Sequence, residues 1–143
     1  MAASIDSTTS TNASSYDRPT VTWQRTALML AAWFEIIVGV SFIFALNTQS
    51  QFLFETTTEG PGVHFARLAG IALIALGITC LPSTPAGTHQ AVRTLLIFNI
   101  AATILFAWVA LTTTFRGVML WPVVIMHAVI AIALALSSRK ERP

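Results

Sequence analysis

The sequence has few charged residues and a single cysteine, and both shortages narrow the classes of protein to which the chain can belong. Charged residues make up 10% of its 143 residues, and hydrophobic residues make up 55%. Soluble domains carry about 25% charged residues, so most of this chain has no aqueous surface to cover. The net charge of +2 and the lack of a basic run argue against nucleic-acid binding.

The single cysteine, Cys80, restricts redox and metal chemistry. One thiol excludes an internal disulfide, a CxxC redox pair and a zinc site made of four thiolates. It also excludes the paired-thiol chemistry of four-helix enzymes of the vitamin K reductase type. The sequence contains no nucleophile–base pair, metal-ligand spacing or glycine-rich phosphate loop. We therefore expect no enzyme activity, no metal and no cofactor, and we interpret Cys80 as a small apolar filler.

The sequence is rich in long hydrophobic runs. Four of them cover about residues 26–46, 64–81, 91–111 and 118–136. Each is close to the roughly 20 residues that a membrane-spanning helix needs. We therefore predict an all-α fold, an integral membrane four-helix bundle within residues 23–137. The link between the third and fourth runs is short, so we expect these two helices to be antiparallel neighbours.

Two tails flank the predicted bundle, at residues 1–22 and 138–143. The first is rich in Ser, Thr and Asn and cannot bury enough apolar surface to fold, so we predict a disordered tail. It lacks the basic start and apolar stretch of a signal peptide, so we expect the first span to remain as an anchor. The second tail is basic. Residues 48–63 form a predicted loop between the first two spans, and its apolar segment Gln51–Phe54 is expected in the headgroup layer.

The basic residues predict how the chain is oriented, because cytoplasmic loops of membrane proteins carry an excess of Lys and Arg. Six basic residues fall on the side of the two termini and two on the opposite side: Arg18, Arg25, Arg93, Arg139, Lys140 and Arg142 against Arg67 and Arg116. We therefore predict a multi-pass protein of the cell (cytoplasmic) membrane with both termini in the cytoplasm.

Three of the predicted spans carry one polar side chain near mid-depth: Glu35, Asn99 and His127. At about 1.5 Å per residue, these side chains lie at similar depths in the bilayer. Small residues on the faces of Glu35 and Asn99 allow close helix packing. A polar group that faced lipid would cost several kcal/mol. We therefore predict that the three residues form one buried cluster.

Two interpretations of this cluster stay open. In the first, Glu35 binds a proton and is tuned by His127 and Asn99, because burial favours a neutral carboxyl and a nearby imidazolium favours a carboxylate. That balance would suit proton-coupled transport or quinone chemistry. In the second, a neutral Glu35 hydrogen-bonds Asn99 or His127 and holds the bundle together. A haem held by two histidines is not expected, since His64 and His89 fall at opposite membrane surfaces.

Arg67 lies one turn inside the second span, near the predicted outer surface. Helical side chains point toward the helix N-terminus, which here leads to that surface. The guanidinium can therefore reach the lipid headgroups. The alternative is an ion pair of Arg67 with Glu55, Glu59 or Glu35.

The pattern over about residues 25–137 resembles small bacterial four-helix membrane proteins of the DoxX-like kind. The resemblance is carried by the three polar residues of the cluster and by three short segments: Ala66–Gly70, Leu76–Gly77 and Trp121–Pro122. It implies a four-helix bundle in the bacterial cytoplasmic membrane, and named members are associated with respiratory or redox functions. This chain lacks paired thiols, and their absence argues against a redox function.

Small multidrug transporters are also four-helix chains with a glutamate in the first helix, and the segment Trp33–Gly39 is similar to theirs. Their loops are shorter and their third helix is rich in glycine, whereas residues 91–111 here contain none. We therefore expect an accessory or structural protein in the lipid bilayer, associated with a larger membrane complex or with copies of itself. The alternative is a small proton-coupled transporter that uses Glu35.

Overall fold

The structure is a computed structural model that describes residues 19–81, 85–115 and 117–139. These residues fold into helices without any strand, which confirms the predicted all-α class and four-helix bundle. The helices are α1 (Pro19–Phe44), α2 (Leu46–Phe54), α3 (Pro61–Thr79), α4 (Pro85–Thr112) and α5 (Leu120–Arg139). Of the two predicted tails, residues 1–18 and 140–143 lie outside the described residues. Residues 19–22 belong to α1 and not to a tail, and proline is favourable at a first helical position.

Four of the helices are long and apolar enough to cross a membrane, over Trp23–Phe44, Pro61–Thr79, Gly87–Thr112 and Leu120–Ser138. Large apolar side chains are exposed on all four, among them Leu30, Ile37, Phe65, Ile97, Leu111 and Ile125. Soluble proteins rarely expose apolar surface on this scale, whereas a hydrocarbon environment favours it. The chain is therefore a multi-pass membrane protein.

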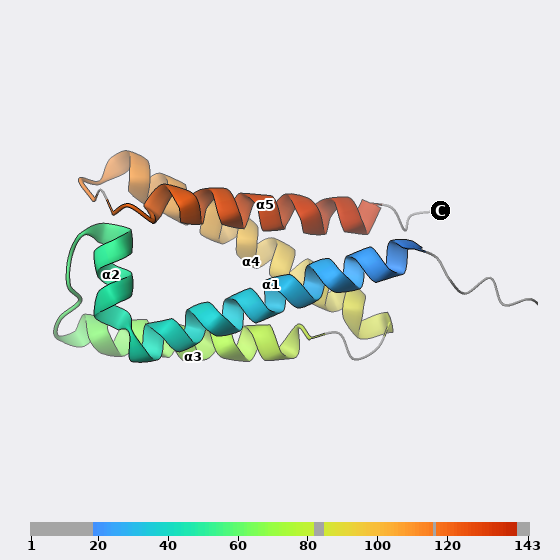
Figure 1. Cartoon of the computed structure of the whole chain (residues 1–143), viewed down its shortest axis with the longest axis horizontal. Coiled ribbons are helices and arrows are strands. Elements are labelled where there is room, and N and C mark those ends of the chain that lie inside the picture. Colours follow the sequence, from blue (N-terminus) through green and yellow to red (C-terminus); the bar gives the residue numbers. More distant parts are fainter. Residues whose placement is uncertain (1–18, 82–84, 116, 140–143) are drawn as a thin grey trace, which may run out of the picture.

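The long helices pair as two hairpins. α1 packs along α3, and α4 packs along α5, as expected from the short link between the last two spans. α1 also contacts α4 and α5 and so joins the two hairpins, while α3 lies at the edge of the molecule (Figure 1). The first and last described residues lie at one end of the bundle, and α2 lies at the opposite end (Figure 1).

The contact between α1 and α3 is close because both helices place glycines there. A Cβ atom on Gly39 would lie 2.6 Å from the carbonyl oxygen of Gly70, and a Cβ atom on Gly70 would lie 2.6 Å from that of Gly39. A Cβ atom on Gly77 would similarly lie 2.6 Å from the Ala32 carbonyl oxygen. Small residues therefore set the distance between these two helices, as they commonly do in membranes.

The predicted loop between the first two spans contains a helix, α2, that the sequence analysis did not predict. Its buried residues Leu46, Ser50 and Leu53 lie on one face. It follows α1 after a break at Ala45 and ends at Glu55, which adopts the left-handed conformation with φ 55°. α2 therefore folds back over the end of the bundle and is not part of any span.

α2 is attached to the segment that precedes α5. The Met119 amide donates to the Phe52 carbonyl at 2.9 Å. Gly117 makes room for this contact, because a Cβ atom there would lie 2.1 Å from the carbonyl carbon of Leu53. The contact between these backbones explains why α2 is held against the bundle.

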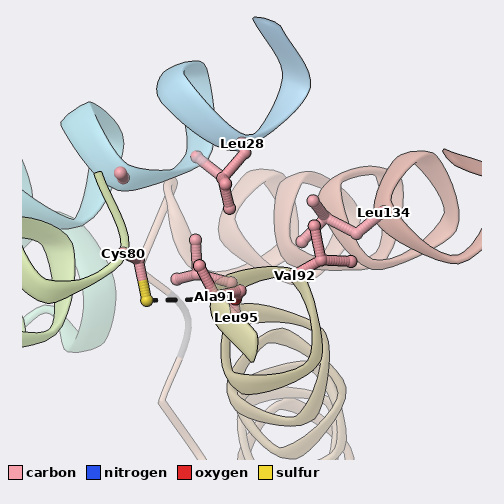
Figure 2. Packing of buried hydrophobic residues seen from close by; sticks show 8 residues of the cluster. Leu28, Cys80, Ala91, Val92, Leu95 and Leu134 are labelled. Atoms are coloured by element: carbon pink, nitrogen blue, oxygen red, sulfur yellow. Dashed lines mark hydrogen bonds between the residues drawn. The ribbon is translucent and has the colours of Figure 1, made fainter. Parts of the chain in front are cut away.

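A cluster of buried apolar residues closes the opposite end, near the chain ends. Its members come from α1, α4, α5 and the end of α3: Leu28, Ala31, Ala32, Cys80, Ala91, Val92, Leu95 and Leu134. Figure 2 shows Cys80 directed at the first turns of α4, where its thiol donates to the Ala91 carbonyl at 3.9 Å. Cys80 is a free thiol and is 2% exposed, so it fills space between α3 and α4.

Candidate functional site

The three polar residues of the spans lie together where α1, α4 and α5 meet. Glu35, on α1, is 1% exposed, Asn99, on α4, is 0% exposed, and His127, on α5, is 6% exposed. Ala31 and Ala102 lie one turn from Glu35 and Asn99 and are also buried. Glu35 and Asn99 therefore lie on the same inward faces as the small residues that let the helices approach.

Asn99 is at the centre of the cluster. Its Nδ2 group donates to the Leu95 carbonyl one turn earlier at 2.9 Å, which fixes the orientation of the amide. Its Oδ1 atom lies 2.8 Å from Nδ1 of His127. An amide oxygen can only accept a hydrogen bond, so the Nδ1 atom of His127 carries the hydrogen and donates it.

Glu35 joins the cluster through the same amide. The side chain of Asn99 lies next to the Glu35 carboxyl group and interacts with it. The carboxyl oxygen Oε1 of Glu35 is buried and has no partner among the described residues. Asn99 thus connects α4 to α5 and to α1, and one oxygen of Glu35 is left unsatisfied.

Three phenylalanine rings surround the imidazole of His127. The ring of Phe106 is stacked with it at a centroid distance of 5.9 Å and an interplanar angle of 11°. Phe34 and Phe98 make edge contacts with centroid distances of 5.9 Å and 6.1 Å. These rings belong to α1 and α4, so they pack α5 against both helices and keep the surroundings of the Asn99–His127 hydrogen bond apolar.

The arrangement separates the two groups that can bind protons. Glu35 and His127 each contact Asn99, and no hydrogen bond joins the side chains of Glu35 and His127 in the described part of the chain. A neutral amide donates and accepts hydrogen bonds but does not itself take up and release protons near neutral pH. The cluster is therefore a row of polar side chains with an amide in the middle and not a direct carboxyl–imidazole pair.

Arg67 lies outside this cluster. It is exposed on α3 and makes no ion pair with Glu35, Glu55 or Glu59, all of which the structure describes. Instead it lines a pocket at the end of the bundle where α2 begins. The ion pair of Arg67 with any of these three carboxylates is therefore absent from the described part of the chain.

Two features of the structure were not predicted from the sequence. One is the set of phenylalanine rings around His127, which depends on the rotation of each helix about its axis. The other lies outside the cluster, near the start of α1: Gln24 is 3% exposed, and its Nε2 atom is buried without a partner among the described residues. Its position near the start of the first apolar run gave no signal of burial, because polar residues at such positions commonly face the membrane surface.

The residues that the structure describes include no group of three or more His, Cys, Asp or Glu side chains that could hold a metal ion. Comparisons with protein families, with curated proteins and with solved structures found no match to this chain.

Proposed function

We propose that the chain is a structural or accessory component of a cell membrane, in which the Glu35–Asn99–His127 cluster joins two helical hairpins. The observation that carries this proposal is the position of Asn99. Its side chain is fully buried, accepts a hydrogen bond from His127 on α5 and interacts with the carboxyl group of Glu35 on α1. One amide therefore links the α4–α5 hairpin to the α1–α3 hairpin.

Two physical arguments favour a structural role for this cluster. The three side chains are between 0% and 6% exposed, so water has almost no access to Glu35 in the described part of the chain. The amide of Asn99 also interrupts proton exchange between Glu35 and His127. What remains is a set of buried polar contacts, and such contacts can select one register between packed helices.

We place this component in the bacterial cytoplasmic membrane, with both termini in the cytoplasm. The excess of basic residues beside the termini supports the orientation, and the resemblance to DoxX-like proteins supports the membrane. The partner is a larger membrane complex or a further copy of the chain. Purification in a mild detergent separates these two cases by the mass of the assembly.

A small proton-coupled transporter is the second candidate, and the unpartnered Oε1 atom of Glu35 favours it. A buried polar atom without a partner is costly, and such groups inside membranes commonly belong to ion or proton pathways. A proton or a water molecule bound at Oε1 would relieve the cost. This candidate requires the bundle to open, because the carboxyl group is 1% exposed in this structure.

Glu35→Gln separates the two candidates, because glutamine keeps the hydrogen-bonding shape but cannot exchange a proton with solvent. We expect this variant to fold as the parent chain does and to leave any flux in pH-gradient-loaded membrane vesicles unchanged. Glu35→Leu is the matched variant, since it removes the acceptor as well and is expected to lower thermal stability. A folded Glu35→Gln variant that abolishes a pH-gradient-driven flux would establish the transporter and exclude the structural proposal.

A further inference from the structure

A second polar feature lies at the end of the molecule that carries α2, away from the buried cluster. It is a pocket of about 240 Å³ between the end of α1, the start of α2 and the first turns of α3, with Asn47, Thr48 and Arg67 in its lining. Pockets for drug-sized ligands measure about 300–1,000 Å³. This pocket therefore suits a small polar group better than a large substrate.

The charge of the pocket lining determines whether it binds a cationic or an anionic group. Arg67 is the one charged residue in the described lining, and it makes no ion pair with the carboxylates of the nearby loop. A guanidinium presents its donors in a planar fork that matches the oxygens of phosphate. Asn47 and Thr48 are exposed and have no hydrogen-bond partner for their side chains in the described part of the chain. They supply further donors to the pocket lining.

Another part of the lining is held in place by the chain itself. Thr58 lines the pocket, and its hydroxyl bonds that of Ser50 on α2 at 2.5 Å. Ser50 is 5% exposed. The loop before α3 is therefore fastened to α2, so the pocket has a defined side that does not depend on a ligand.

The position of the pocket favours a lipid over a soluble anion. It lies where the span of α1 ends at Phe44 and that of α3 begins at Pro61, which is the level of the headgroups. Phe44, which lines the pocket, is 83% exposed, so its ring is available to an acyl chain. No acidic residue appears in the described lining, so nothing there matches the cation of a choline headgroup.

From these observations we propose that the pocket binds the phosphate group of an anionic phospholipid, with Arg67 as its counter-charge. Asn47 and Thr48 donate to the remaining phosphate oxygens, and an acyl chain lies against Phe44. This site is independent of the Glu35–Asn99–His127 cluster, so it holds whether that cluster is structural or binds a proton.

Native mass spectrometry of the full chain in detergent tests the proposal, with phosphatidylglycerol and phosphatidylcholine of identical acyl chains as probes. We expect the parent chain to prefer phosphatidylglycerol by about fivefold, which corresponds to about 1 kcal/mol for one arginine at a membrane surface. Arg67→Gln should lose this preference, and Arg67→Lys should keep part of it. Arg93→Gln is the matched control, because Arg93 is exposed on α4 near the opposite end.

The outcomes that overturn the proposal are equally defined. Equal binding of the two lipids by the parent chain would exclude an anion-selective site, and an unchanged preference in Arg67→Gln would exclude this pocket. Thermal unfolding in the presence of inorganic phosphate tests whether the pocket binds a free phosphate ion and not the phosphate group of a lipid. Stabilisation by inorganic phosphate that requires Arg67, without any preference for phosphatidylglycerol, would assign the pocket to a soluble anion and reject the lipid. Because Arg67 is exposed, its substitutions are expected to leave the fold intact.

Discussion

At the scale of single residues, the cost of an unsatisfied polar group outweighs the value of any one hydrogen bond. An interhelical hydrogen bond in a membrane contributes about 0.6 kcal/mol on average. A buried group that loses its partner costs about 1–3 kcal/mol. Asn99 serves both Glu35 and His127, so its removal affects two buried groups together. Asn99 is therefore the residue of the cluster on which stability depends most.

The substitution Asn99→Leu tests this point with little change in volume. We expect it to destabilise the bundle by at least about 1–3 kcal/mol, because Glu35 and His127 both lose a buried partner. Thermal unfolding in detergent measures the change. Thr94→Val is the control on the same helix, since Thr94 is only half-buried and its hydroxyl donates to the Gln90 carbonyl one turn earlier. Equal stability of the two variants would show that Asn99 does not hold the hairpins together.

At the scale of helices, steric contact between α1 and α3 replaces the hydrophobic effect, which is weak between helices in lipid. Alanine normally stabilises a helix relative to glycine. At Gly39, however, the added Cβ atom would lie 2.6 Å from the Gly70 carbonyl oxygen and 2.8 Å from Cγ1 of Ile74. Overpacking of this kind costs about 1–3 kcal/mol. The steric cost therefore exceeds the gain in helix propensity, and an alanine at position 39 is expected to destabilise the bundle.

Gly39→Ala should accordingly lower the unfolding temperature of the purified chain. Gly62→Ala provides the control on α3, because its Cβ atom would meet only Cγ2 of Thr58, at 3.1 Å, which can shift. We expect this second variant to be neutral or slightly stabilised, through the reduced freedom of the unfolded chain. If both variants behaved alike, the close approach of α1 and α3 would not limit the packing.

The same scale shows what the sequence could and could not predict. The four spans followed from hydropathy and length, and the inward direction of Glu35 and Asn99 followed from the cost of polar groups in hydrocarbon. The helix α2 could not be predicted, because Leu46, Ser50 and Leu53 form only a short pattern in a polar segment. Its helix depends on a contact that is distant in sequence. The rings around His127 likewise depend on helix rotation, which apolar sequences leave open.

At the scale of the whole molecule, the structure combines two hairpins that are joined near mid-membrane and closed at each end by different means. The apolar cluster with Leu28 and Leu134 closes the end near the chain termini. α2 covers the other end and is held there through Gly117. Polar chemistry is thereby divided between a buried site at the centre and an open pocket at one surface. This division is why a substitution at Arg67 and one at Asn99 are expected to have separable effects.

The orientation of the molecule in its membrane remains a prediction. The first and last described residues lie at one end of the bundle (Figure 1), and the excess of basic residues on that side of the sequence pattern predicts that this end faces the cytoplasm. Alkaline phosphatase fused at either terminus in a bacterial host is expected to be inactive, and phosphatase inserted at the exposed Thr56–Thr57 segment to be active. A fluorescent protein should show the opposite pattern.

Two contrary results would carry different meanings. Active phosphatase at both termini would reverse the orientation but keep four spans, because the termini would still share one side. Active phosphatase at only one terminus would require one of the four helices not to cross. The helix that does not cross would then most simply be α3, since it has the lowest mean hydropathy of the four spans, 1.6 against 2.2 for each of the others.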